Sequence, residues 1–337
     1  MKFDIENNHW KVLGDFKDTH PQMKLSLEKY LNSMDALFRK AKEKQECEFI
    51  LSLLAIRGCQ DSGWDLFEGI ENTFKSLDQM RQKSRRNYHG EQTIYLFMYG
   101  LILESDPLYE LLANLLNIAE GQRFLISGAN FPDITHPCGK IQTVPPIDKI
   151  NQIKNRARKL NLDLSLFDEF YDKDLRNALF HSDYVLFNNE IRLPNFRFPK
   201  VYKNVDWVIL TNNAMAYYQA LTQLRRYHIG LYDKPKRVKP HPEMVHNNDE
   251  EMLLIVRQKH GVIGMKDAFT KEELSRGAIP CSLGRFYPDE QKLIREGQLL
   301  MPVHKESFIN AIYRFSPDWL KRIILKLHNK KRNKNGK

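Results

Sequence analysis

Residues 93–119, TIYLFMYGLILESDPLYELLANLLNIA, decide the fold class of this 337-residue chain. The stretch is strongly apolar on both sides of a single break at Asp106-Pro107, where the proline favours a new helix start over continuation. The pattern predicts two helices, over 93–103 and 108–119, and Gly121 follows as a helix stop. Two such helices in succession indicate a mainly helical protein.

Helical patterns continue on both sides of this stretch. Apolar residues recur at intervals of three and four in the segments before it, and an amphipathic segment and a long helical segment follow it. The helices expected on this basis are 22–45, 46–57, 64–82, 147–160 and 205–228. Their number and length predict a mainly α fold.

Short strands are expected in two places. Residues 184–187 and 190–193 flank Asn188-Asn189, a pair that tolerates positive φ and so suits a two-residue hairpin turn. Residues 252–257 and 262–265 form a second candidate hairpin near the C-terminus. The predicted fold is therefore mainly α with a small β-hairpin insertion, plus a small mixed α/β C-terminal segment.

A basic, proline-rich sequence, KPKRVKPHP over 234–242, looks like a stiff linker. It suggests a helical domain over 1–232 with an N-terminal helical extension, a linker over 233–248, and a small C-terminal domain over 249–337. In the last of these, a capping box at 270–273 and Ser316-Pro317-Asp318 each predict a helix start. The sequence leaves open whether this domain senses a partner, docks RNA or supports a dimer.

Composition excludes several classes of protein. Of the net charge of +10, eight charges lie in the acid-free tail over 319–337, so the remainder carries only +2. The four cysteines form no CxxC pair, which argues against a disulfide scaffold or a structural zinc site. A start without a leader-like apolar segment, and the lack of any apolar run near ~20 residues, predict a cytoplasmic protein that is neither secreted nor membrane-spanning.

Residues 172–184, DKDLRNALFHSDY, contain the candidate chemistry. On a helix, one arc is predicted to face the core and consists of Leu175, Ala178, Leu179 and Ser182. The opposite arc consists of Arg176, Asn177, Phe180 and His181. A cation, an amide and an imidazole are thus expected together, facing solvent or a partner.

The sequence LRNALFH resembles the HEPN superfamily, whose helical domains carry an arginine, usually a polar residue after it, and a histidine beyond four to six further residues. Here Asn177 follows Arg176, and four residues separate Arg176 from His181. The resemblance implies a four- or five-helix bundle, a homodimer that brings two motifs together, and metal-independent RNA cleavage, often in a toxin or phage-defence setting. Some relatives have a tyrosine two residues after the histidine, whereas Asp183 stands there in this chain and Tyr184 follows it.

The three residue types fit such a reaction. RNA supplies its own nucleophile, the 2′-hydroxyl, so cleavage needs a proton acceptor or donor and a cation beside the phosphate. His181 suits the first need, and Arg176 can hold phosphate oxygens in bidentate fashion. Asn177 would orient His181 or bind the phosphate. The product would carry a 2′,3′-cyclic phosphate, and neither a metal nor a cofactor is expected.

Other interpretations stay open at this level. A histidine in the last turn of a helix is favoured by the helix dipole, and Arg176 could simply pair with Asp172 or Asp183. Arg322 and His328 repeat the spacing, but Ile323 replaces the polar residue. The competing function is a non-catalytic helical module that binds RNA, a nucleotide or a partner protein, and a regulatory protein partner is compatible with either function.

Overall fold

The structure is a computed structural model that describes residues 2–6, 9–13, 21–55, 59–84, 88–126, 128–135, 139, 141–194, 199–242, 251–257, 259–268, 271–272 and 282–286. The chain divides into two compact units. The first comprises Met1–Lys44, Leu66–Gln122 and Ser127–His228, and the second Gln45–Asp65, Arg123–Ile126 and Ile229–Lys337. The chain therefore passes from one unit to the other several times.

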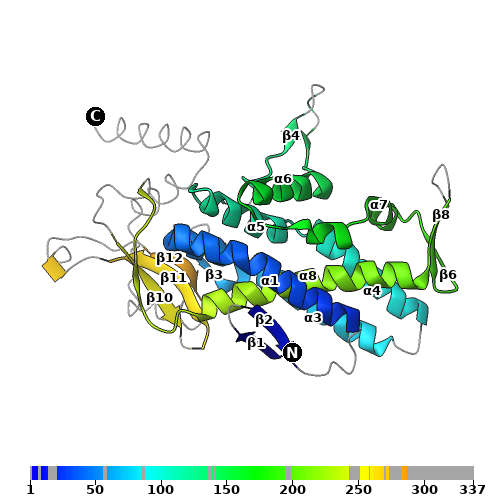
Figure 1. The fold of residues 1–337 in the computed structure, drawn as a ribbon, viewed down its shortest axis with the longest axis horizontal. Coiled ribbons are helices and arrows are strands. Elements are labelled where there is room, and N and C mark those ends of the chain that lie inside the picture. Colours follow the sequence, from blue (N-terminus) through cyan, green and yellow to red (C-terminus); the bar gives the residue numbers. More distant parts are fainter. Residues whose placement is uncertain are drawn as a thin grey trace, which may run out of the picture. The chain divides into compact units, whose positions relative to one another are not determined.

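The first unit is a helical bundle with small antiparallel sheets at its surface (Figure 1). Its helices are α1 (Pro21–Lys44), α3 (Leu66–Lys83), α4 (Tyr88–Glu104), α5 (Asp106–Ala119), α6 (Pro146–Lys159), α7 (Lys173–His181) and α8 (Asn204–Gly230), with a 3-10 turn η2 (Ser165–Glu169). The strands are β1 (Lys2–Glu6), β2 (His9–Leu13), β4 (Ile134–Thr135), β5 (Ile141–Gln142), β6 (Val185–Phe187), β7 (Glu190–Leu193) and β8 (Lys200–Tyr202). The prediction of a mainly α protein is confirmed.

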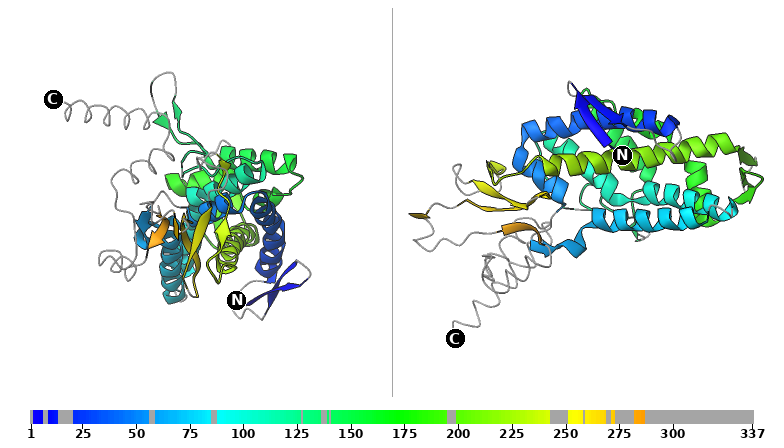
Figure 2. Two further views of the ribbon diagram at one scale, coloured as in Figure 1. Left: turned by 90° about the vertical axis from the view of Figure 1, so that its left-hand side faces the viewer. Right: turned by 90° about the horizontal axis from the view of Figure 1, so that it is seen from below.

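Helix α8 is the centre of this unit and lies between α1 and α3 (Figures 1 and 2). Between Thr211 and His228, only Arg226 is exposed. The ring of Tyr217 packs on Phe167 of η2 and on Phe170, which directly follows η2, with centroids 5.3 Å and 5.1 Å away. A helix that is buried on nearly all sides needs neighbours in every direction, and the surrounding helices supply them.

Buried polar groups on α8 fix its position against those neighbours. Asn213 accepts a hydrogen bond from Ser26 of α1 at 2.7 Å and donates one to the Glu169 carbonyl at 3.1 Å. His228 Nε2 lies 3.0 Å from Asp35 Oδ1 of α1. Because a buried polar group without a partner costs roughly 1–3 kcal/mol, these pairs select one register of α8.

The predicted helices form with ends shifted by only a few residues. The break predicted at Asp106-Pro107 is observed, since Ser105 separates α4 from α5 and Pro107 lies in the first turn of α5. The hairpin turn predicted at Asn188-Asn189 also forms, and both residues have positive φ, 47° and 67°. None of the helices in the described ranges combines the length and apolar content that a bilayer crossing requires.

The N-terminal hairpin β1–β2 was not predicted. Its strands pair antiparallel, with Ile5 opposite Trp10, and the Trp10 ring packs edge-on against Tyr227 of α8 at 4.8 Å. Strand β2 buries only Trp10 and Val12. Two buried positions are too few to give a recognisable alternation in the sequence.

The second unit combines helix α2 (Glu46–Leu54) with a five-stranded sheet. The sheet order is β3 (Cys59–Asp61), β12 (Ser282–Phe286), β11 (Gly261–Asp267), β10 (Met252–Arg257) and β9 (Arg237–Val238), and only the β3–β12 pair is parallel. The predicted hairpin near the C-terminus is confirmed as β10–β11. Helix α2 is buried along most of its length, and Cys47 Sγ lies 3.6 Å from Met265 Sδ of β11.

This sheet includes segments to which the sequence assigned other roles. The predicted linker over 233–248 contains strand β9, which pairs with β10. Residues 45–65 and 123–126, placed by sequence in the domain over 1–232, belong to the second unit. The helix start predicted at Ser316, the pair Arg322 and His328, and the basic tail lie outside the described residues, and so does most of the helix predicted from Thr270.

Two substitutions at Tyr217 test the central packing of α8. Burial raises the pKa of Tyr217, and among the described residues its hydroxyl has no hydrogen-bond partner. Replacing Tyr217 by Ala removes a ring packed on two others and is expected to lower the free energy of unfolding by about 3–5 kcal/mol in urea denaturation. Tyr217→Phe keeps the ring and is expected to be neutral or stabilising, so an equal loss in both variants would contradict this account.

Candidate active site

Helix α7 begins and ends at well-defined caps. Asp172 is the N-cap, and its Oδ1 accepts hydrogen bonds from the backbone N–H groups of Asp174 and Leu175, both at 2.9 Å. Ser182 adopts the left-handed conformation, with φ of 57°, and the Asp183 N–H bonds the Ala178 carbonyl at 2.9 Å. The helix therefore stops at His181, and the chain turns directly towards β6.

The predicted division of α7 into two faces holds for most residues. Leu175 and Ala178 are buried, and Leu179 is half-buried. Ser182 was expected to face the core but is exposed, because the helix ends one residue earlier and Ser182 becomes its C-cap. The opposite face is open to solvent, most of all at Phe180 and His181.

Helix α4 packs against α7. The Tyr99 hydroxyl donates to the Phe170 carbonyl at 2.8 Å and accepts from the Asp172 N–H at 3.2 Å. The next residue of α4, Gly100, lies against the Phe180 ring, and a β carbon at this glycine would stand 3.2 Å from that ring. The two helices thus approach closely where the candidate site lies.

The Arg176 guanidinium is held on two sides. Its Nε and Nη2 contact the carboxylate of Glu104, the last residue of α4, and its Nη1 donates to Asn177 Oδ1 at 2.8 Å. The partners considered from sequence, Asp172 and Asp183, are not the ones observed. Glu104 is 72 residues away in the sequence, and only the packing of α4 on α7 brings it here.

The ion pair leaves part of Arg176 available. The side chains of Arg176 and Glu104 are 22% and 33% exposed, so the pair lies at the surface. A guanidinium has five N–H donors; Glu104 and Asn177 engage three of them, which leaves one on each Nη atom. Because Asn177 presents its oxygen to Arg176, its amide N–H groups point away from the guanidinium.

His181 lies one turn beyond Asn177 on the same face of α7. It is exposed, and within the described part of the chain its side chain makes no hydrogen bond or ion pair. The structure therefore places Arg176 and Asn177 in contact and leaves His181 next to them without a fixed partner. This arrangement presents donors and an imidazole to a ligand approaching from solvent.

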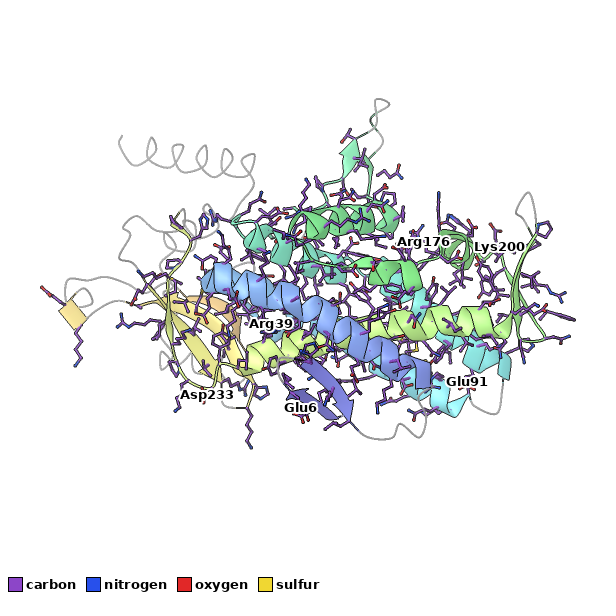
Figure 3. All side chains as sticks on the ribbon, in the orientation of Figure 1. Glu6, Arg39, Glu91, Arg176, Lys200 and Asp233 are labelled. Carbon is purple, nitrogen blue, oxygen red and sulfur yellow. The ribbon has the colours of Figure 1, made fainter. Side chains whose placement is uncertain are left out.

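Strand β8 borders the start of α7, and Figure 3 labels Lys200 on this strand and Arg176 on the helix. Lys200 Nζ lies 3.0 Å from Asp174 Oδ2 and 3.5 Å from Asp172 Oδ2, and the Tyr202 hydroxyl donates to Asp172 Oδ1 at 2.9 Å. Burial alone would lower the pKa of Lys200, but its bonds to Tyr202 and Asp174 and the charge of Asp172 raise it. Sequence reasoning did not find these two residues, since nothing local links them to α7.

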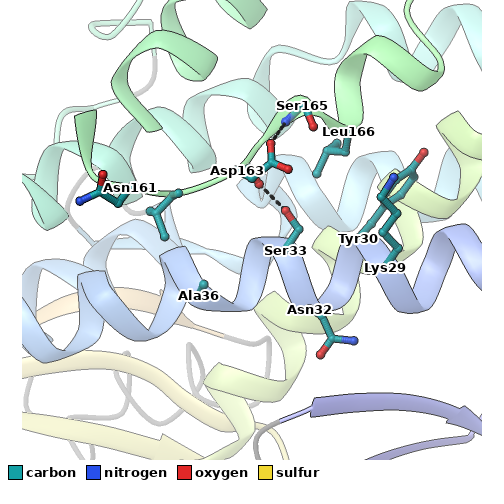
Figure 4. Close-up of a pocket in the computed structure, with 10 residues that line it drawn as sticks. Lys29, Tyr30, Asn32, Ser33, Ala36, Asn161, Asp163, Ser165 and Leu166 are labelled. Atoms are coloured by element: carbon teal, nitrogen blue, oxygen red, sulfur yellow. Dashed lines mark hydrogen bonds between the residues drawn. The ribbon is translucent and has the colours of Figure 1, made fainter. Parts of the chain in front are cut away.

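A cavity of about 290 Å³ lies elsewhere in the first unit, between α1 and residues 161–166 (Figure 4). Three of its lining residues bond one another: Ser33 donates to the Asp163 carbonyl, and Asp163 Oδ1 accepts from the Ser165 N–H at 2.8 Å. Hydrogen bonds from Ser165 lower the pKa of Asp163. This cavity offers no histidine or arginine, so α7 is the better candidate site.

No family model matches this chain, and no curated protein or solved structure is significantly similar to it. Within the described ranges, no group of three or more His, Cys, Asp or Glu side chains could hold a metal ion. The chemistry assigned to α7 therefore rests on its own residues.

The cap of α7 can be tested by two neighbouring substitutions. Asp172→Ala removes the acceptor of two backbone N–H groups and of Tyr202, and is expected to lower the free energy of unfolding by about 1–2 kcal/mol. Asp174→Ala is the matched control, because Asp174 shares Lys200 but caps nothing, and its cost is expected to stay below about 1 kcal/mol. Chemical denaturation that ranks the two variants in the opposite order would contradict the assigned role of Asp172.

Proposed function

We propose that this protein is a metal-independent endoribonuclease of the HEPN type, with Arg176, Asn177 and His181 as its catalytic residues. The proposal takes the helices of the first unit as a HEPN-like bundle. The observation that carries it is the shared face of α7, where a partly exposed guanidinium, an amide bonded to it and an exposed imidazole stand off the core. A toxin or phage-defence setting is the biological role that the resemblance favours.

The reaction starts with a base that removes the proton of the RNA 2′-hydroxyl. The 2′-oxygen then attacks the adjacent phosphorus, the bond from phosphorus to the 5′-oxygen breaks, and an acid protonates the leaving oxygen. The products are a 2′,3′-cyclic phosphate and a 5′-hydroxyl. His181 supplies one of the two proton transfers, and the corresponding histidine of a second copy supplies the other, which is why we propose a homodimer with a composite site.

Arg176 stabilises the charge that builds up on the phosphate. The two N–H donors that remain on its Nη atoms suit a phosphate oxygen, and the amide of Asn177 adds a further donor. Glu104 holds the guanidinium through its Nε and Nη2 atoms, and this contact orients the remaining donors before RNA binds. The ordering of Arg176 is thus completed in the folded protein and not at the moment of binding.

The ion pair between Glu104 and Arg176 also favours a second candidate function. A carboxylate neutralises the charge that would attract phosphate, and the pair joins α4 to α7 as a structural contact would. On this alternative, the face of α7 belongs to a non-catalytic helical module that binds RNA, a nucleotide or a partner protein.

Cleavage of RNA in the presence of EDTA separates the two functions. The unsubstituted chain is expected to cut RNA to products with 2′,3′-cyclic ends, and His181→Ala or Arg176→Ala is expected to slow the reaction by about 10²–10⁴-fold. The loss follows because each variant removes a group that stabilises the transition state of the cleavage step.

Two exposed residues of the first unit provide matched controls, His89→Ala on α4 and Arg226→Ala on α8, and both should retain full activity. Equal background cleavage in all samples would reject the enzyme and leave the binding module. Activity that survives in His181→Ala alone would remove the imidazole from the mechanism.

The composite site predicts self-association. Sedimentation velocity at micromolar concentration is expected to show a dimer, because a single copy supplies only one imidazole to the site. A chain that stays monomeric at concentrations where it cuts RNA would contradict the composite site and require a second proton-transfer group within one copy.

A further inference from the structure

The sheet that follows α7 has an apolar outward face. In the β6–β7–β8 sheet, Val185 stands opposite Arg192, which in turn stands opposite Val201. Ile191 and Leu193 point inward and are buried, whereas Val185, Phe187 and Val201 are each about half exposed, at 49%, 48% and 50%. A small sheet that buries one face usually carries polar residues on the other, so three half-exposed apolar side chains beside Arg192 on the outward face indicate a binding surface.

Arg192 and Phe187 form a stacked pair on that face. The Arg192 guanidinium lies over the Phe187 ring, 4.4 Å from its centroid, and remains 45% exposed. Glu190 Oε2 accepts from Arg192 Nε at 3.1 Å and from Nη2 at 2.9 Å, which holds the guanidinium plane in place. The tight turn at Asn188-Asn189 fixes the two strands in this register.

The pair is ordered before any ligand arrives. A planar cation that rests on a ring extends the π surface outward, and a nucleobase can stack on such a guanidinium as on an aromatic side chain. Val185 and Val201 flank Arg192 and provide an apolar surface that the edge of a base or a ribose can contact. We define Val185, Phe187, Arg192 and Val201 as the stacking platform.

The stacking platform is linked to the candidate site at both ends of α7. Strand β6 begins four residues after His181, so its first residue lies at most about 14 Å from that histidine, within reach of a short RNA segment. At the other end, Lys200 and Tyr202 of β8 bind Asp174 and Asp172 at the start of α7. The platform is therefore connected to α7 by the chain at one end of the helix and by side-chain contacts at the other.

We propose that the stacking platform binds unpaired bases of RNA beside the phosphodiester that α7 cleaves, and so selects single-stranded RNA; this inference rests on the proposed function. Bases within a duplex already stack on one another and leave no free face for Phe187 or Arg192, whereas bases of a single strand do. A protein partner would use the same apolar residues but would not depend on a planar guanidinium. Substitution of Arg192 by Lys therefore separates a protein partner from RNA.

The test measures affinity separately from cleavage. Fluorescence anisotropy of a short labelled single-stranded RNA is followed with the full chain carrying His181→Ala, and with that chain also carrying Phe187→Ala, Arg192→Ala or Arg192→Lys. Each additional substitution is expected to weaken binding by about 5- to 150-fold, including Arg192→Lys, which keeps the charge but loses the plane. The same RNA annealed to its complement is expected to bind weakly and to respond little to these substitutions.

Matched controls come from the same unit. Leu25→Ala replaces an exposed apolar residue of α1, and Arg226→Ala breaks an exposed arginine–glutamate pair with Glu71; both should leave the affinity unchanged. Thermal melting verifies that every variant is folded. We expect them to fold because each substituted side chain is exposed by close to half or more of its surface.

The outcomes distinguish this inference from the proposed function. Affinity within about twofold in Phe187→Ala, or full affinity in Arg192→Lys, overturns the stacking platform even if the unsubstituted chain cuts RNA. Weakened binding in all three variants of a chain that does not cut RNA supports the platform and rejects the nuclease. Absence of RNA binding, or loss of self-association in place of RNA affinity, also overturns the platform, the latter because the face would then join two copies.

Discussion

The burial of α8 constrains the first unit more than any other feature. From Thr211 to His228 the helix is covered almost entirely, and two of its polar side chains, Asn213 and His228, reach partners on α1 and at Glu169 of η2. An apolar surface alone would allow α8 to slide or rotate, whereas the contacts of Asn213 and of His228 Nε2 form in one position only. Helix α4 is tied to α8 in the same way, because the Tyr95 hydroxyl donates to Asn212 Oδ1 at 3.1 Å.

The position of α7 follows from that of α4. The local sequence gives α7 its N-cap, its C-cap and its apolar stripe, but these do not decide what the polar face meets. Helix α4 sets the distance between the two helices through Tyr99 and Gly100. It also sets the direction of the Arg176 guanidinium through Glu104. The residues of the candidate site thus come from one short helix, but their geometry is set by residues of another helix far away in the sequence.

The parts of the molecule that sequence could predict are those governed by neighbours in the chain. Helical spacing, the break at Asp106-Pro107 and the turn at Asn188-Asn189 depend on residues a few positions apart, and all are observed. The pairing of β3 with β12, the role of Glu104 and the interleaving of the two units depend on residues tens to hundreds of positions apart. Ser182 shows the limit at short range, since a shift of one residue in the helix end changed it from core to cap.

Gly100 has a consequence for how this site can change during evolution. Glycine within a helix costs roughly 1 kcal/mol relative to alanine, and here it admits the Phe180 ring at a distance that a β carbon would make tight. The gap between the two helices is therefore set by a missing side chain. A lineage that placed a side chain at this position would push on the half-exposed Phe180 ring, which would have to move by a few tenths of an ångström or give way to a smaller residue, so drift at one position is tied to a compensating change at another.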